Sequence, residues 1–268
     1  MSTSTLRHAI LLIKKYHARV YEGVKQDLHQ KYVGSIFGSM WTIIYPVIQL
    51  SIYGCLYNFI FKIRPPGLTE MGYVVLVFSG LVPLLAFSEA LMAATNSLTS
   101  NKNILLNTVF PAELIPLRAA ISAQASSVVG IVATIATGLL LGRSSWLALV
   151  LTPIIWCLLL MFAIGIGWLL SLVALIARDI QHILTLVTSL LFVLSPFAYT
   201  PEMIPGPLKF IIYLNPLSYF VMAFQQIICY DTFPDLIVII PVVTLGLGSF
   251  FLGLSTFMRV KSTFFDYA

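Results

Sequence analysis

Six long apolar runs, almost free of charged residues, limit what this chain can fold into. They cover residues 35–61, 73–98, 119–141, 146–177, 183–199 and 236–258. A helix needs about 17–25 apolar residues to cross the hydrocarbon core of a bilayer. Only 9% of the residues are charged, whereas soluble domains have about 25%. The sequence therefore predicts an all-α integral membrane protein, in which residues 35–268 form one domain with six transmembrane helices.

Residues 1–34 differ from the rest, because apolar and basic residues recur there at helical spacing. The apolar residues are Leu6, Ile10, Ile13, Val20, Val24 and Leu28, and the basic ones include Arg7, Lys14, Lys15 and Lys25. A basic amphipathic helix before a first span usually lies in the plane of the membrane interface. We therefore expect an interface helix. Its attraction to anionic lipid head groups accounts for the formal net charge of +5 without a nucleic-acid partner.

The distribution of Lys and Arg also predicts the orientation. These residues accumulate on the cytoplasmic side of membrane proteins. If the basic N-terminal segment is inside, six spans place Arg259 and Lys261 of the C-terminal tail on the same side. We expect both termini to be cytoplasmic.

An aromatic and amide stripe runs along the first apolar run, with one member at every fourth position. Its members are Phe37, Trp41, Tyr45, Gln49, Tyr53, Tyr57 and Phe61. Side chains four residues apart lie nearly above one another on a helix. We interpret the stripe from Trp41 to Tyr57 as the lining of a translocation pathway, and assign Phe37 and Phe61 to the interfacial aromatic belts. A packing surface between helices is the alternative.

Glu89 is the one acidic residue in the predicted spans, and ionisable residues inside a membrane mark functional sites. We include it among the pathway residues; the alternative is a carboxyl group held by a hydrogen bond from a neighbouring helix. Coupling to an ion gradient usually needs more than one such group, which disfavours an ion-driven carrier. No GxxxxGK[ST], HExxH or GxSxG motif occurs, and the three cysteines have no metal-type spacing. We therefore predict neither a catalytic nor a metal site, and no nucleotide bound by this chain.

Residues 200–234 are rich in proline, and their apolar pieces are too short to span a bilayer. Such segments are typical of re-entrant or interfacial helices, which are tolerated at membrane depth where protein or a water-filled cavity covers them. We expect short re-entrant helices between the fifth and sixth spans.

Several motifs, in their order and spacing, resemble the membrane permease of type-2 ABC exporters for polysaccharides. They are Lys31-Tyr32-x-Gly34-Ser35-x-x-Gly38-x-x-Trp41 with Pro46, Phe110-Pro111-x-Glu113-x-x-Pro116-Leu117, Arg178-Asp179-Ile180, Ser195-Pro196-x-x-Tyr199, Pro201, Pro205 and Asn215-Pro216-Leu217. Each fragment alone is weakly specific, and the first differs from the family by Lys in place of the more usual Arg.

The resemblance implies that two copies of the chain work with two ATP-binding cassette subunits, which carry ATP and Mg. It implies roles for three groups of residues. The loop that couples to the ATPase would contain Asn101, Lys102, Asn103, Ile104 and Phe110. The entrance for a charged head group would contain Lys25, Lys31 and Tyr32. The re-entrant helices would form an external gate with Pro196, Tyr199, Pro205, Asn215 and Pro216.

The resemblance further implies a bacterial cytoplasmic membrane location and a polyprenyl-linked polysaccharide as cargo. O-antigen ranks first, with capsular polysaccharide or teichoic acid as alternatives and a drug or small-lipid exporter below them. A membrane enzyme acting on polyprenyl-linked sugars is a competing class, but it would need clustered charged residues that the chain lacks. The stripe suits a saccharide cargo, because aromatic rings with polar tips contact both the C–H faces and the hydroxyls of a sugar.

Overall fold

The computed structural model describes residues 3–61, 65, 67–101, 111–177 and 179–265. The chain is helical throughout these residues, as predicted, without a strand in the described part. The longer elements are α1 (Thr3–Lys31), α2 (Trp41–Cys55), α3 (Glu70–Ser100), α5 (Leu114–Ala123), α6 (Ala125–Leu140), α7 (Trp146–Ile176), α8 (Ile180–Leu194), α10 (Pro216–Ile228) and α11 (Leu236–Phe265). The shorter ones are η1 (Gly38–Met40), η2 (Leu56–Phe61), η3 (Pro201–Met203), η4 (Gly206–Leu208) and α9 (Lys209–Leu214).

Three helices, α3, α7 and α11, are long and apolar enough to cross a membrane by length and composition. Two pairs of helices pass the same test only together, because each pair is bent: α5 with α6 by 43°, and residues 206–214 with α10 by 97°. The described chain thus has three candidate spans, or up to five if each bent pair counts as one.

Two of the six predicted spans differ here from what the sequence suggests, the first in the kind of helix and the fifth in its end. The first begins with η1, continues as α2 over 15 residues and ends in the π-helix η2. The fifth is α8, which also has 15 residues and ends before Pro196, because a proline disfavours helical geometry in the residue that precedes it.

The third predicted span is broken at Gln124, where α5 ends and α6 begins. The Gln124 side chain ties the break to two neighbours. Its Nε2 donates to the carbonyl of Ala86 on α3, and its Oε1 accepts from Trp156 Nε1 on α7. A buried polar group therefore fixes the place where the helix bends.

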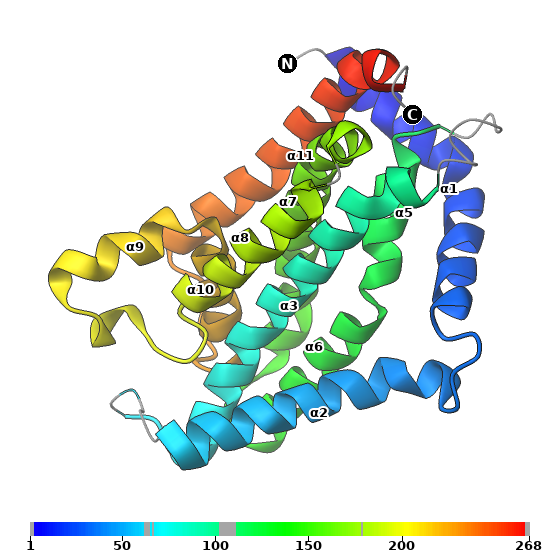
Figure 1. Ribbon diagram of the computed structural model, residues 1–268. Helices are drawn as coiled ribbons and strands as arrows, with labels where there is room; N and C mark the ends of the chain where they lie inside the picture. Colours follow the sequence, from blue (N-terminus) through cyan, green and yellow to red (C-terminus); the bar gives the residue numbers. More distant parts are fainter. Residues whose placement is uncertain (1–2, 62–64, 66, 102–110, 178, 266–268) are drawn as a thin grey trace.

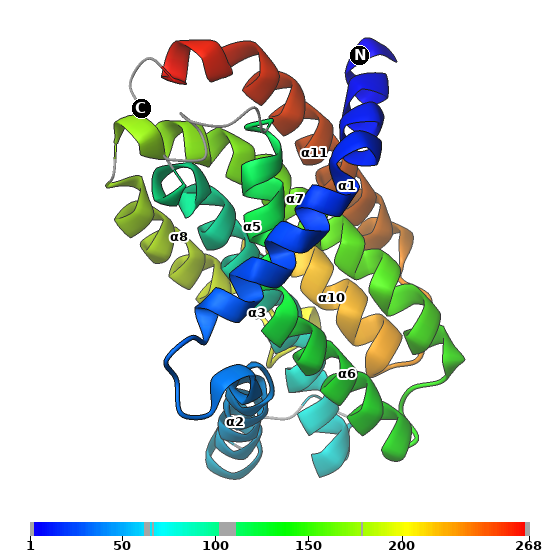
Figure 2. The same cartoon turned by 90° about the vertical axis from the view of Figure 1, so that its right-hand side faces the viewer.

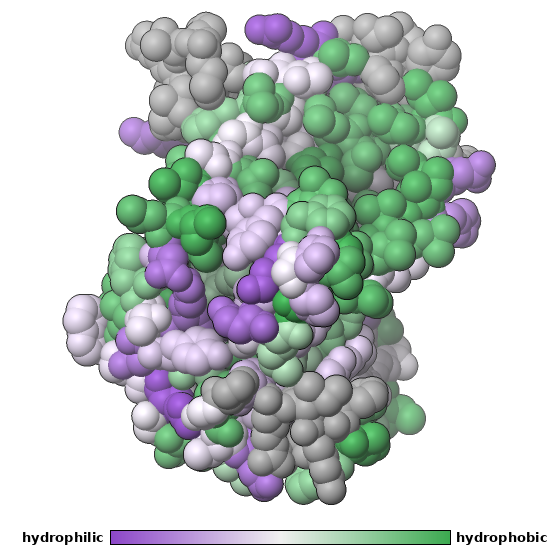
Figure 3. All heavy atoms as spheres, turned by 90° about the vertical axis from the view of Figure 1, so that its left-hand side faces the viewer, coloured by the Kyte–Doolittle hydropathy of each residue, from purple (hydrophilic) through white to green (hydrophobic). Residues whose placement is uncertain are grey.

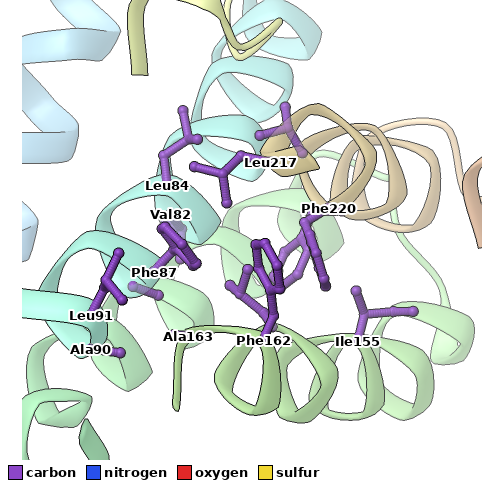
Figure 4. Close-up of a cluster of buried hydrophobic side chains, with 14 of the residues drawn as sticks. Val82, Leu84, Phe87, Ala90, Leu91, Ile155, Phe162, Ala163, Leu217 and Phe220 are labelled. Carbon is purple, nitrogen blue, oxygen red and sulfur yellow. The ribbon is translucent and has the colours of Figure 1, made fainter. Parts of the chain in front are cut away.

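The core lies where α3, α7 and α10 meet (Figures 1 and 4). Phe162 stands between two other rings, with its ring centroid 5.2 Å from that of Phe87 and 5.6 Å from that of Phe220. Leu84, Ile155 and Leu217 surround this stack in Figure 4 and are also buried. Stacked aromatic rings contribute about 0.5–1.5 kcal/mol per pair beyond their buried area.

Small residues let α7 approach two helices closely, as the Gly165-Ile166-Gly167 sequence predicts. A methyl group on Gly165 would meet the Ser249 backbone of α11, and one on Gly167 would meet the Ala94 side chain of α3. On α11, a methyl group on Gly253 would meet the Gly165 carbonyl oxygen. Close approach through small residues is how membrane helices gain packing energy without a hydrophobic driving force.

The outside of the bundle is strongly apolar. Leu186 and Val193 of α8, Val132 of α6 and Leu252 of α11 are all at least 60% exposed. Soluble monomers rarely expose contiguous apolar surface on this scale. The exposed face therefore fits a lipid environment, in agreement with the composition.

The helix α1 lies across the end of the bundle instead of running with it. Figure 2 shows α1 crossing over α5, and Figure 1 shows α9 and the start of α11 at the opposite end. Below, the end that carries α1 is called the α1 end, and the end that carries α9 is called the α9 end.

Candidate functional site

A large cavity, of about 700 Å³, opens at the α1 end between α1, α2, α3 and α5. Its lining combines aromatic rings, hydroxyls, amides and three charged groups. The polar and aromatic lining residues are Asp27, Lys31, Tyr32, Trp41, Tyr45, Glu89, Asn96, Ser97, Ser100, Asn101, Ser122 and Ser126. We name this space the inner cavity. It brings together residues that are far apart in sequence and were predicted as separate pathway, entrance and coupling groups.

The stripe divides into two parts along the first span. Trp41 and Tyr45 line the inner cavity, and Gln49 lines a narrow extension of it of about 20 Å³. The extension shares Tyr45, Glu89 and Ser126 with the inner cavity, so the two spaces adjoin. The pathway interpretation therefore has a physical counterpart for these three residues, although their role in transport stays a prediction.

The other two stripe residues pack against rings of α8 and the segment after it. The Tyr57 ring meets that of Phe197 edge to face at 5.5 Å, and the Tyr53 ring lies 6.2 Å from those of Phe192 and Phe197. Neither Tyr53 nor Tyr57 lines the inner cavity. In this part of the span, the stripe forms the packing surface that was the alternative interpretation.

Glu89 lies at the bottom of the inner cavity, on α3, and is only partly exposed. Its Oε2 accepts a hydrogen bond of 3.3 Å from Ser127 Oγ on α6. Nearby, the buried Oδ1 of Asn96 has no hydrogen-bond partner among the described residues, and Asn96 also lines the cavity. Glu89 thus both accepts a bond from a neighbouring helix and faces the cavity, where it can accept further bonds from hydroxyls.

Of the three predicted entrance residues, two line the inner cavity and one does not. Lys31 and Tyr32 line the inner cavity, with Lys31 Nζ 5.6 Å from the centroid of the Tyr32 ring. Lys25 is exposed on α1 and does not line the cavity. The cation of Lys31 is therefore the one that the structure brings to the cavity mouth.

The predicted coupling residues Lys102, Asn103, Ile104 and Phe110 lie outside the described residues. Asn101 is described: it caps the end of α3, donates from Nδ2 to the Ser97 carbonyl at 2.8 Å, and lines the inner cavity. The first residue of the predicted coupling segment therefore lines this cavity.

An ion pair that the sequence analysis did not identify holds α1 on α5. Arg118 Nε and Nη2 donate to the two carboxylate oxygens of Asp27, at 2.8 and 2.5 Å. Gly23, one turn before Asp27, makes room for this arginine, because a methyl group there would lie 2.6 Å from Arg118 Cδ. Spacing along α1 alone could not reveal the pair, because its members are 91 positions apart.

We expect the two opposite changes Asp27→Arg and Arg118→Asp to impair export severely when made singly and to compensate partly when combined. Each single change places like charges at a half-buried contact, which loosens α1 from the bundle, whereas the double change restores opposite charges. Export measured in cells carrying each variant tests this. A double variant as defective as the worse single one would contradict a role for the pair itself.

A second ion pair joins the start of α5 to α11. Glu113 Oε2 accepts from Lys261 Nζ at 2.9 Å, and Glu113 is 2% exposed. The Glu113 carbonyl also accepts from Trp168 Nε1 of α7 at 2.7 Å. Glu113 belonged to a motif that carried the family resemblance, but its partner could not be read from the sequence. Directly after the predicted coupling segment, α5 is thus tied to both α7 and α11.

The predicted gate residues lie together at the α9 end. Asn215 caps α10 through Oδ1, which accepts from the Leu217 amide at 2.9 Å, and its Nδ2 donates to Ser195 Oγ at 2.8 Å. Pro216 opens α10, and the carbonyl of Pro196 accepts from Gln225 Nε2 at 2.9 Å. The remaining two, Tyr199 and Pro205, flank η3 in the connecting segment. The 97° bend agrees with a pair of helices that enters and leaves on one side, while gating itself stays a prediction.

A basic helix across one end of an apolar bundle, with a polar cavity at that end, fits a membrane transport protein. The chain belongs to the ABC-2 type transporter family, whose sequence profile matches residues 23–229. It is similar to the O-antigen export system permease protein RfbA of Klebsiella pneumoniae, with 30% identity over 208 residues, which cover 75% of this chain and 76% of that one. A second Klebsiella pneumoniae protein of the same name is 27% identical over 89% of this chain and 90% of its own. The protein of that name from Myxococcus xanthus is 22% identical over 82% of this chain and 84% of its own.

Proposed function

We propose that this chain is the permease half of an ATP-driven exporter that moves a lipid-linked polysaccharide across the bacterial cytoplasmic membrane, with O-antigen as the first candidate. The observation that carries the proposal is the inner cavity, in a chain whose family and relatives are export permeases. Capsular polysaccharide and teichoic acid remain the alternative cargoes of the same machinery.

The chemistry of the inner cavity fits a saccharide that is attached to a charged carrier. The rings of Trp41 and Tyr45 offer surfaces for the C–H faces of a sugar, and Glu89 offers acceptors for its hydroxyls. Lys31 offers a cation for a phosphate group of the carrier. A ligand that is polar, hydroxyl-rich and joined to an anionic group uses all three kinds of contact.

The energy source in this proposal is a separate pair of ATP-binding cassette subunits, which bind ATP and Mg and act on a dimer of this chain. Nucleotide can drive transport only by favouring one arrangement of the permease pair over another. The two ion pairs of α5 follow the predicted coupling segment 101–110 in sequence, and they would pass a movement of α5 to α1 and α11 through charged contacts.

We further propose six spans with both termini in the cytoplasm: α2 with η2, α3, α5 with α6, α7, α8 and α11. In this arrangement α9 and α10 form the re-entrant gate on the outside, and α1 lies on the cytoplasmic interface. The proposal is supported by the exposed apolar faces of α2 and α8 and by the basic residues of α1.

The double variant Trp41→Ala/Tyr45→Ala is expected to lower export strongly while leaving assembly with the ATPase intact, because the two rings line the cavity without forming the core. Surface polysaccharide of cells that depend on this permease gives the measurement, and co-purification of the ATPase gives the assembly control. Tyr53→Ala is the matched comparison, since it removes a ring of the same span that packs against α8 and should reduce stability instead. Normal export by the double variant would refute the pathway role of the stripe.

A further inference from the structure

A second cavity, of about 590 Å³, lies at the α9 end, between η3, α9, α10 and the start of α11. We propose that this outer cavity is a binding site for uncharged sugar residues of the polymer as it leaves the membrane. The inference rests on the proposed export function, and it adds a site and a charge preference that the inner cavity does not supply. Figure 3 looks onto this side, where hydrophilic side chains lie in the centre of the face, below a mainly apolar upper part.

The lining of the outer cavity has the chemistry of a carbohydrate site. Two tyrosines, two glutamines, two threonines and two carboxylates face it. They are Tyr213, Tyr230, Gln225, Gln226, Thr200, Thr232, Glu202 and Asp235. Together they provide rings for C–H faces and both donors and acceptors for hydroxyls.

Gln225 is a buried polar side chain in the wall of the outer cavity. It is 3% exposed, and its Nε2 donates to the carbonyls of Pro196 and Phe197 at 2.9 and 3.3 Å. Its Oε1 takes part in no hydrogen bond among the described residues, and this oxygen is not fully enclosed by protein. A buried amide, fixed by its nitrogen to the segment before η3, thus keeps a free acceptor at a cavity wall.

The two tyrosines offer uncharged surfaces to the cavity from two elements, α9 and the segment after α10. Tyr213 is 39% exposed and Tyr230 is 42% exposed. Burial, with the neighbouring Cys229 and Glu202 side chains, raises the pKa of Tyr230 to about 12 although Arg143 opposes the shift. Its phenol therefore stays protonated at physiological pH and can donate a hydrogen bond.

The charges of the lining indicate which sugars are accepted. Glu202 and Asp235 are carboxylates, and none of the described residues that line the cavity is Lys or Arg. Asp235 is held in place, because its Oδ2 accepts from Gln226 Nε2 at 2.6 Å. Carboxylates accept bonds from hydroxyls but repel phosphates and uronic acids. The site therefore suits uncharged sugar residues, in contrast to the inner cavity with its Lys31.

Cysteine protection in cells tests the site. Thr232→Cys places a thiol in the outer cavity, and Leu208→Cys places one on η4, exposed but outside the cavity. Both are made after Cys55→Ala and Cys157→Ala, which leaves the buried Cys229 as the remaining native thiol. A membrane-impermeant maleimide is the probe, applied to cells that make the polymer and to cells in which polymer synthesis is blocked.

We expect polymer production to slow the labelling of Thr232→Cys several-fold and to leave the labelling of Leu208→Cys unchanged. Adding Glu202→Ala should remove most of the protection, because it deletes a lining carboxylate for which no bond within the described protein is present. Equal protection at both cysteines, or protection that survives Glu202→Ala, would overturn the site, since a polymer that only passes by would give either result. Surface polysaccharide is measured in parallel. If export proceeds without protection, this inference alone fails; if export does not depend on the chain, the proposed function fails.

Discussion

Lys261→Met is expected to lower both the thermal stability of the protein and its export activity, and to do so strongly. The change removes the partner of Glu113, whose carboxylate is almost completely buried at the start of α5. Leaving one member of a buried ion pair alone costs about 3–5 kcal/mol, and less where the missing partner was partly exposed. Lys261 is 34% exposed in its side chain, which places the expected loss toward the lower end. The apparent melting temperature of the detergent-solubilised protein gives the measurement.

Two further variants separate the charge from the packing. Lys261→Arg keeps the cation and should preserve stability, whereas Glu113→Gln combined with Lys261→Met removes both charges and should recover much of the loss. If the double variant is no more stable than Lys261→Met, the buried charge is not the cause.

Gly253→Ala is expected to be the most damaging conservative change in α11. A methyl group there would meet the carbonyl oxygen, carbonyl carbon and Cα of Gly165 on α7, and backbone atoms cannot move aside as a flexible side chain can. Overpacking of this kind costs about 1–3 kcal/mol. The same measurement of melting temperature detects it.

Gly248→Ala is the matched control, because it makes the same substitution in the same helix. A methyl group on Gly248 would meet nothing within 4 Å. Alanine has a higher helix propensity than glycine by about 1 kcal/mol, so this variant should be as stable as the native protein or more stable. A loss of stability as large as that of Gly253→Ala would show that glycine at α11 matters for a reason other than contact with α7.

The sequence predicted most of the helices, because apolar runs of bilayer length can form little else. It could not predict the break at Gln124, since a single polar residue in an apolar run is equally compatible with a straight helix. The bend depends on Ala86 and Trp156, which lie on other helices and are distant in sequence. The short α8 follows from Pro196, which disfavours helical geometry in Ser195 before it.

Helical spacing in the sequence also predicted part of the candidate site. Spacing along one helix placed Trp41 and Tyr45 on a common face, and both line the inner cavity. The same spacing could not separate them from Tyr53 and Tyr57, because the neighbours of these two, Phe192 and Phe197, come from a different part of the chain. Asp27–Arg118 and Glu113–Lys261 were missed because each pair joins elements that only the tertiary fold brings together.

The narrowing of the inner cavity has a consequence for the shape of any route across the membrane. The space lined by Gln49 and Glu89 has a volume of about 20 Å³, which is close to what a single water molecule needs, about 10–15 Å³ by the same kind of measure. A sugar ring cannot pass there, and the stacked rings of Phe87, Phe162 and Phe220 fill the middle of the bundle. Under the export function proposed above, we therefore expect the polymer to pass between two copies of the chain in this conformation and not through the middle of one.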